Sequence, residues 1–200
     1  MDKMKRILVV SLLPLLLALS ILAEANDDRD IFEYNRVKGV LLEKFVDFID
    51  WPSGSDVSDK SKPFIINVIG KNPFIIIEKG KKTTEDWLNR LYSNKKIKGK
   101  IVKIRSISDV KDIPASNLLF ISNSEKKNLD KIISFAKENH VLTVADSAGF
   151  AKKGVHINFY VEKGNIRFEI CETAIFDSGF KPSSHVLKLA DIVCPRKKRR

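Results

Sequence analysis

Residues 154–170 read GVHINFYVEKGNIRFEI, and this stretch decides how the sheet of this chain is expected to end. Apolar and polar side chains alternate before and after residues 162–165, which is the pattern of two half-buried antiparallel strands joined by a tight turn. The side chains expected to face the core are Ile157, Phe159, Val161, Ile166, Phe168 and Ile170. The stretch therefore predicts a β-hairpin with one covered face and one polar face.

The polar face of this hairpin is a candidate functional site. It is expected to place His156, Asn158 and Tyr160 across from Arg167 and Glu169, because residues opposite each other in an antiparallel pair become neighbours. One interpretation is a solvated face with an Arg–Glu pair. The other is a surface that receives a partner or a small ligand, and the residues alone leave both open.

Upstream of the hairpin, predicted strands alternate with predicted helices. Nearly uninterrupted apolar runs predict strands at residues 64–69, 101–104, 118–121 and 141–144, the first of them central in a sheet. Helices are predicted at residues 31–50, from Pro73 to about Tyr92 with Asn72 as N-cap and an interruption at Gly80, and from about residue 122 to 139. The order favours an α/β fold with a mostly parallel sheet, flanking helices and a C-terminal antiparallel hairpin.

The N-terminus resembles an export signal. A short positive stretch, MDKMKR, precedes an apolar run over residues 7–22 and an A-x-A pattern at residues 23–25. These three features are typical of a cleaved secretory signal peptide. We therefore predict a signal peptide at residues 1–25, a single domain over residues 26–195, a basic tail at residues 196–200, and a periplasmic location.

The chain is strongly basic, with a formal net charge of +11. In a cytosolic protein this balance would suggest nucleic acid, which an exported protein does not meet. The remaining interpretations are an anionic envelope surface, an acidic partner, or a basic tail that is merely solvated. No cofactor or metal is expected, because His140, His156 and His185 lack ligand spacing and no phosphate-binding loop motif occurs.

The stretch FKPSSHVLKLADIV, residues 180–193, contains the adjacent residues Ser183, Ser184 and His185. A serine beside a histidine can belong to a nucleophilic site or can start a helix. The chain has no G-x-S-x-G motif, and the serines directly precede an apolar helical pattern. We therefore predict an N-capped helix over residues 183–193 and no enzyme activity.

Two cysteines, Cys171 and Cys194, are expected after the last strand and after the last helix. An even number of cysteines in an oxidising compartment favours a disulfide. Whether these two chain ends meet does not follow from the sequence.

The ordered motifs also resemble a known family. GVHINFYVEKGNIRFEI followed by GFKPSSHVLKLADIV is similar to the C-terminal signature of the YfiR-like family, and VKGVLLEKFVDFIDWP is similar to its first helix. The pieces PFIINVIGKNPF, LLFISNSE and VLTVADSAGFAKKG match in the same order, so the resemblance covers residues 36–193. Three features depart from the family pattern: the KGKK interruption, Cys171 where asparagine is usual, and the basic tail.

The resemblance implies a non-catalytic periplasmic regulator. Such a protein binds and inhibits the periplasmic sensor region of a membrane diguanylate cyclase, and it tends to form a homodimer. The matched positions are Phe150, Arg167, Glu169, Ser183, Ser184 and His185, with Phe150 and Glu169 as the strongest candidates for a functional surface. The alternative is a small-ligand sensor that uses the polar hairpin face beside the loop ADSAGF, residues 145–150.

Overall fold

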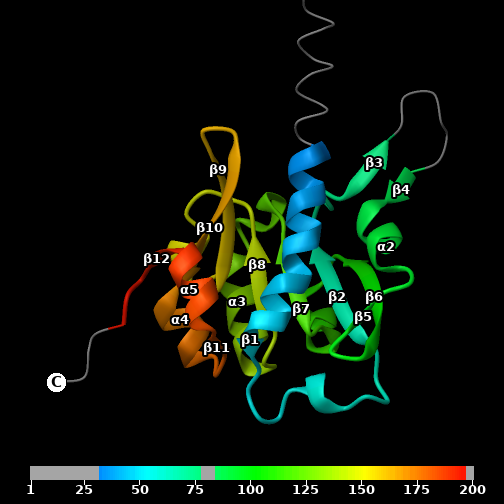
Figure 1. Ribbon diagram of the computed structural model, residues 1–200, viewed down its shortest axis with the longest axis horizontal. Coiled ribbons are helices and arrows are strands. Elements are labelled where there is room, and N and C mark those ends of the chain that lie inside the picture. Colours follow the sequence, from blue (N-terminus) through cyan, green and yellow to red (C-terminus); the bar gives the residue numbers. More distant parts are fainter. Residues whose placement is uncertain (1–31, 78–83, 197–200) are drawn as a thin grey trace, which may run out of the picture. The chain divides into compact units, whose positions relative to one another are not determined.

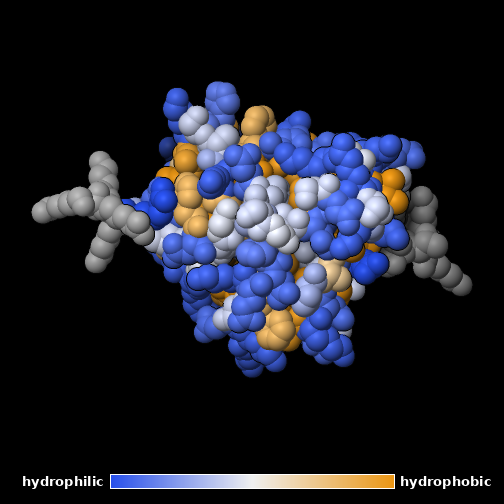
Figure 2. Space-filling view, turned by 90° about the horizontal axis from the view of Figure 1, so that it is seen from below, coloured by the Kyte–Doolittle hydropathy of each residue, from blue (hydrophilic) through white to orange (hydrophobic). Residues whose placement is uncertain are grey.

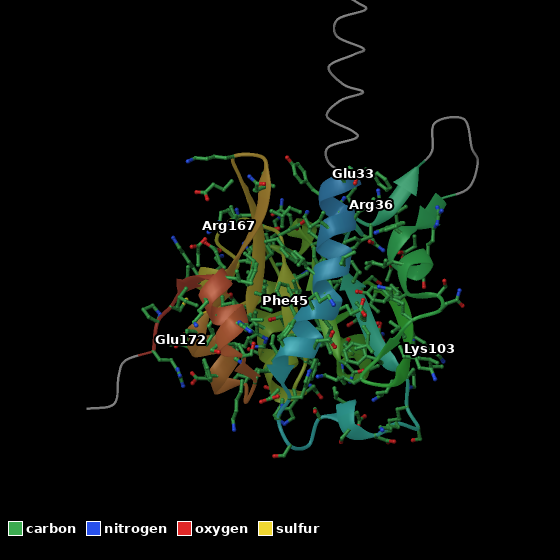
Figure 3. All side chains as sticks on the ribbon, in the orientation of Figure 1. Glu33, Arg36, Phe45, Lys103, Arg167 and Glu172 are labelled. Carbon is green, nitrogen blue, oxygen red and sulfur yellow. The ribbon has the colours of Figure 1, made fainter. Side chains whose placement is uncertain are left out.

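The computed structural model describes residues 32–77 and 84–196 and divides the chain into two units, residues 1–36 and residues 37–200. The described residues of the first unit are helical, and its Arg36 Nη1 lies 2.9 Å from Glu33 Oε1 (Figure 3). The predicted signal peptide, the KGKK interruption and residues 197–200 of the tail lie outside the described residues. The predicted domain boundaries stay a prediction.

The second unit contains a sheet of eight described strands in the order β12-β10-β9-β8-β7-β2-β6-β5 (Figure 1). The strands are β2 (Phe64–Ile69), β5 (Lys96–Ile97), β6 (Lys100–Ile107), β7 (Leu118–Ile121), β8 (Leu142–Ala145), β9 (Ile157–Glu162), β10 (Asn165–Cys171) and β12 (Asp191–Val193). Strands β6, β2, β7, β8 and β9 are parallel, whereas β10 is antiparallel to β9. The predicted fold class is confirmed, including the central position of residues 64–69.

Helices cover both faces of the sheet because both faces of its central strands are apolar. Residues 37–48, α2 (Trp87–Tyr92), α4 (Glu172–Asp177) and α5 (Ser184–Leu189) contribute to the core on one face. On the other face, α3 (Leu129–Glu138) packs with the 3-10 segments η2 (Val110–Ala115) and η4 (Ala151–Lys153). Figure 1 shows the helix of residues 37–48 in front of the sheet and α3 behind it.

A short pairing fixes the end of the first helix against the start of the last one. Strand β1 (Ile49–Asp50) pairs antiparallel with β11 (Lys181–Pro182). Directly beyond this pair, the backbone N–H of Ser183 donates to the carbonyl of Phe48 at 2.8 Å. Two segments that lie more than a hundred residues apart in the sequence are thus held side by side.

The helix predicted from Pro73 onward was wrong over most of its length. The described part contains β3 (Ile75–Ile77), paired antiparallel with β4 (Thr84–Asp86), and a helix only from Trp87. Three consecutive isoleucines favour a strand because their branched side chains fit poorly in a helix. Asn72 accepts from the N–H of Phe74 at 2.9 Å and so closes a local turn, while Asp86 caps α2.

Three further helix boundaries differ from the predictions. The first helix ends at residue 48, before β1, and α3 begins at Leu129 after the 3-10 segment η3 (Asn123–Glu125). Helix α5 ends at Leu189, where the predicted helix continued to residue 193, because Ala190 turns to an extended conformation and β12 follows. Among residues 32–77 and 84–196, no helix has the length and apolarity needed to cross a bilayer.

Candidate functional site

The hairpin has the predicted cross-strand register. Asn158 lies opposite Glu169, and Tyr160 lies opposite Arg167. The turn uses Lys163 and Gly164, both with positive φ, which matches the twist of the two strands. The five polar residues proposed from the sequence are therefore brought together on one face of β9 and β10 or directly before β9.

The expectation that this face is open to solvent was wrong for His156 and Asn158, which are 3% and 1% exposed. His156 Nδ1 accepts from the N–H of Thr143 at 3.1 Å, and Nε2 lies 2.9 Å from Ser178 Oγ of the turn after α4. Because Nδ1 accepts, the proton is inferred to sit on Nε2. Burial first, and the charge of Lys137 second, lower the pKa of His156 to about 3.

Asn158 connects the hairpin to the loop that follows β8. Its Oδ1 accepts from the N–H of Ser147 at 3.1 Å, and its Nδ2 lies 3.4 Å from Glu169 Oε2. The neighbouring Asp146 forms a 2.7 Å ion pair with Lys38 of the first helix. The predicted adjacency of the polar hairpin face and residues 145–150 is thus present, but its buried part holds the fold together.

Phe150 is also buried, at 2% exposure, and packs in the core on the α3 side of the sheet. Phe150 is therefore not exposed for contact in this structure, and its part in a binding surface stays a prediction. A phenylalanine after a flexible Gly149 looks exposed in the sequence, because the loop gives no sign that it folds back onto α3.

The exposed part of the hairpin face is a small polar cluster that includes one residue missed by the sequence analysis. Tyr160 Oη donates to Asp191 of β12, and Arg167 lies 3.9 Å from the same carboxylate. The hydrogen bond to Asp191 raises the pKa of Tyr160, and Tyr160 together with Asp191 raises the pKa of Arg167. Asp191 was placed in the predicted last helix, and only the parallel β10–β12 pairing brings it here.

The Pro-Ser-Ser entry is a helix cap, as predicted. Ser183 is the N-cap of α5, and its Oγ accepts from the N–H of Val186 at 3.4 Å. Ser184 and His185 follow in the first turn, and both are exposed. Within the part of the chain that the structure describes, neither makes a hydrogen bond that would activate a serine nucleophile.

The two cysteines meet but are both free thiols. Cys171 pairs in register with Val193, the residue before Cys194, and the N–H of Thr173 donates to the Cys194 carbonyl at 3.0 Å. Burial and the neighbouring Cys171 thiol raise the pKa of Cys194 to about 11. The predicted proximity is present, and the disulfide itself stays a prediction.

A family model described as YfiR/HmsC-like matches residues 35–191, which is most of the chain. This chain belongs to the YfiR/HmsC-like family. Membership of this family supports a periplasmic, regulatory role in cyclic-di-GMP signalling in general. The comparison with curated proteins found no match.

Solved structures similar to this YfiR/HmsC-like chain are distant. They include the ABC domain in complex with L-Trp from Streptococcus pneumoniae, at 9% identity and a TM-score of 0.45, covering 65% of this chain and 55% of that one. A conserved domain protein from Vibrio cholerae has 11% identity and a TM-score of 0.42, and the match covers 64% of this chain and 54% of that one. A ligand-free, open substrate binding protein with adhesive properties from Clostridium difficile has 14% sequence identity and a TM-score of 0.46. The match covers 68% of this chain and 56% of that one. This chain spans about half the length of each, and no function is inferred from them.

The YfiR/HmsC-like chain also exposes apolar side chains on its first helix and at the end of α5. Val37, Val40 and Phe48 lie along one side of the first helix at helical spacing and are 44%, 40% and 43% exposed. Leu189 at the end of α5 is 69% exposed. We refer to these four residues as the apolar surface. The sequence analysis missed the apolar surface because the helical spacing of Val37, Val40 and Phe48 is equally typical of residues that face the core.

Proposed function

We propose that this protein binds the periplasmic sensor region of a membrane signalling protein and inhibits it, and that the target is a diguanylate cyclase. Family membership supports a regulator, and the apolar surface is the observation that carries a binding role. Contiguous exposed apolar side chains are characteristic of protein interaction sites, and the proposal is that these four residues enter one contact. The surface is also preformed, since the β1–β11 pair and the Ser183–Phe48 hydrogen bond fix its two elements.

Polar residues complete this surface. Ser184 and His185 are exposed in the first turn of α5, next to the hydrogen bond between Ser183 and Phe48. An apolar centre with a hydrogen-bonding rim is the usual composition of a non-obligate interface. The two residues proposed from the sequence thus keep a role as rim contacts.

Photo-crosslinking in living cells tests this proposal. A photo-reactive amino acid replaces Phe48 in the full chain, and mass spectrometry identifies what it captures. We expect a membrane cyclase at position 48. The same probe at Ile101, which is 58% exposed on β6 away from the apolar surface, serves as the control and should capture none.

A functional readout accompanies the capture. Deleting the protein should raise cellular cyclic-di-GMP, and Phe48→Glu with Leu189→Glu should reproduce the deletion, because charges at the centre of an interface weaken binding at least about tenfold. Ile101→Glu should behave like the unchanged chain. Unchanged cyclic-di-GMP in the deletion, together with no captured membrane protein, would exclude the proposed target.

The hairpin cluster of Tyr160, Arg167 and Asp191, with the partly buried Glu169, is a second proposed contact. Arg167→Ala should weaken capture less than Phe48→Glu does, because an exposed ion pair contributes about 1 kcal/mol or less. The homodimer implied by the resemblance also stays a proposal. Sedimentation of the unchanged chain and of Phe48→Glu would show whether a second copy uses the apolar surface.

A further inference from the structure

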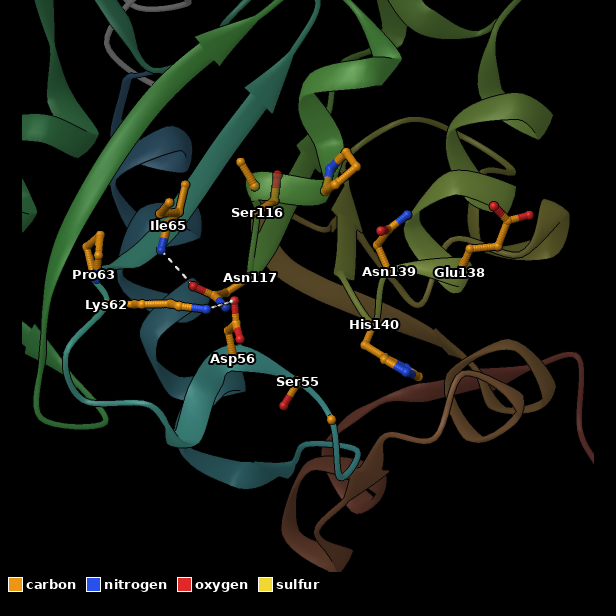
Figure 4. A pocket seen from close by; sticks show the side chains of 13 residues that line it. Ser55, Asp56, Lys62, Pro63, Ile65, Ser116, Asn117, Glu138, Asn139 and His140 are labelled. Carbon is orange, nitrogen blue, oxygen red and sulfur yellow. Dashed lines mark hydrogen bonds and ion pairs between the residues drawn. The ribbon is translucent and has the colours of Figure 1, made fainter.

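A polar pocket of about 440 Å³ lies at the opposite end of the molecule from the carboxyl ends of the parallel strands (Figure 4). Its wall is built by three segments that precede β2, β7 and β8 in the chain, namely residues 54–65, 114–117 and 138–140. Figure 2 shows this side of the molecule from below, and hydrophilic residues dominate it around a neutral centre. The pocket is separate from the apolar surface and from the hairpin cluster.

The floor of the pocket carries polar side chains that are themselves buried. Ser116 is 6% and Asn117 is 8% exposed. Asn117 Oδ1 accepts from the N–H of Ile65 at 2.8 Å, which fixes the amide so that Nδ2 remains a donor toward the pocket. Ser116 Oγ accepts from the buried Asn67 Nδ2 at 2.7 Å and so keeps its own hydroxyl proton as a donor. The floor therefore offers two donors: the Asn117 amide, fixed by its hydrogen bond with Ile65, and the Ser116 hydroxyl, whose proton can rotate toward an acceptor.

One wall of the pocket is a loop that is held in place by a buried lysine. The loop contains η1 (Asp56–Ser58), and the buried Lys100 donates its ammonium to the carbonyl of Asp56 at 2.5 Å. Burial lowers the pKa of Lys100, so keeping this group inside is unfavourable unless it is hydrogen-bonded. The Lys62 ammonium lies 2.9 Å from the Asp56 carboxylate, so these two charges compensate each other.

The opposite wall is negative. The side chain of Glu138, the last residue of α3, forms no ion pair or hydrogen bond within residues 32–77 and 84–196. The carboxyl end of a helix adds partial negative charge at the same place. Next to it, His140 lines the pocket, and its Nδ1 is buried without a partner among the described residues. A chain of net charge +11 thus has a pocket with an uncompensated carboxylate.

We propose that this pocket binds a small amino sugar, with its ammonium at Glu138 and its hydroxyl groups at Asn117 and Ser116. The uncompensated carboxylate and the helix end favour one positive charge. The donors of Asn117 and Ser116 can each donate a hydrogen bond to a hydroxyl oxygen of the sugar. The volume falls in the range of small-molecule sites and accommodates a monosaccharide.

Saturation-transfer NMR with the exported chain tests the proposal with three matched probes: glucosamine, N-acetylglucosamine and glucose. All three share the ring and every hydroxyl group except the one at the second carbon, where glucose has a hydroxyl, N-acetylglucosamine a neutral amide and glucosamine alone an ammonium. We expect glucosamine to bind about three- to fivefold more tightly than either neutral sugar, as for a partly exposed ion pair. The difference should shrink when salt is added, because salt screens such a pair.

Glu138→Gln should reduce glucosamine affinity to that of glucose while leaving glucose binding unchanged. Glu162→Gln changes an exposed carboxylate of the hairpin by the same amount and should leave both affinities unchanged. Circular dichroism of each variant confirms that it is folded. Equal binding of glucosamine and glucose, an unaffected Glu138→Gln variant, or no binding at millimolar concentrations would each overturn the proposal. None of these results depends on whether a membrane cyclase is the protein partner.

Discussion

Replacing His156 by asparagine should flatten the pH dependence of the protein's stability between about pH 7.5 and pH 5. The ring is fully enclosed, and burial first and the Lys137 charge second hold its pKa at about 3, against an ordinary value of 6.5. Between these values the unfolded chain binds a proton at His156 and the native chain does not. Stability contributed by the neutral ring is therefore complete above pH 6.5 and decreases as the pH falls toward 3.

The expected size follows from the two pKa values. Each pH unit in that window corresponds to about 1.4 kcal/mol for one proton. From 6.5 down to about pH 5, His156 should lower the free energy of unfolding by about 2 kcal/mol. The substitution itself should cost about 2–3 kcal/mol at pH 7.5, because it removes the ring contact with Phe180 and the hydrogen bond to Ser178.

Urea unfolding of the unchanged chain and of His156→Asn at about pH 7.5, 6 and 5 measures both effects. The stability difference between the two proteins should shrink by about 2 kcal/mol from the highest to the lowest pH. His185→Asn removes an exposed histidine and should leave the pH dependence unchanged. Parallel stability curves for His156→Asn and the unchanged chain would refute the reasoning, since they would mean that the buried ring takes up a proton as easily as an exposed one.

Three other outcomes are expected. Gly179→Ala should lower stability by about 1–3 kcal/mol in thermal denaturation, because Gly179 has φ +85° and an added Cβ would lie 2.9 Å from Pro52 Cβ; an unchanged melting temperature would contradict this. Ser183→Ala should cost about 1 kcal/mol in urea unfolding through loss of the N-cap, whereas Ser184→Ala should cost little. The chain recovered from an oxidising compartment should show no reactive thiol, because we expect the two neighbouring free thiols, Cys171 and Cys194, to oxidise there to a disulfide that stabilises by about 3 kcal/mol; two titratable thiols in the folded exported chain would exclude it.

The hairpin shows which part of a site a sequence can predict. Alternation assigns each side chain to one of two faces, so the placement of Asn158 and Tyr160 across from Arg167 and Glu169 followed from the sequence. Alternation does not say what covers a face. Here Ser147 and Ser178 supply hydrogen bonds to Asn158 and His156, which allows polar side chains to be buried.

The pocket, in contrast, could not be predicted from the sequence. Its lining residues come from three segments, and the two most distant of them, Gly54 and His140, lie 140 − 54 = 86 positions apart. None of these residues belongs to a motif, because turns that precede parallel strands contain serine, asparagine and proline in most proteins. Only the parallel order β2-β7-β8 places the three turns side by side. The apolar surface was missed for a related reason, since a helical apolar stripe does not show how wide its buried part is.

The two proposed sites share one short segment of chain. Residues 51–53 run from β1, at the end of the apolar surface, directly into the loop wall of the pocket at residues 54–56. Pro52 in this segment packs against Gly179, and β1 pairs with β11. A ligand changes partner affinity only if it binds the partner-bound and free forms differently. Hydrogen bonds hold Phe48 before this segment and Asp56 after it, and Pro52 within it lies against Gly179, so a sugar that shifts the loop wall could act on β1 through this contact. Coupling between the two sites therefore predicts that Gly179→Ala changes sugar affinity and partner capture together, whereas independent sites predict that only stability changes.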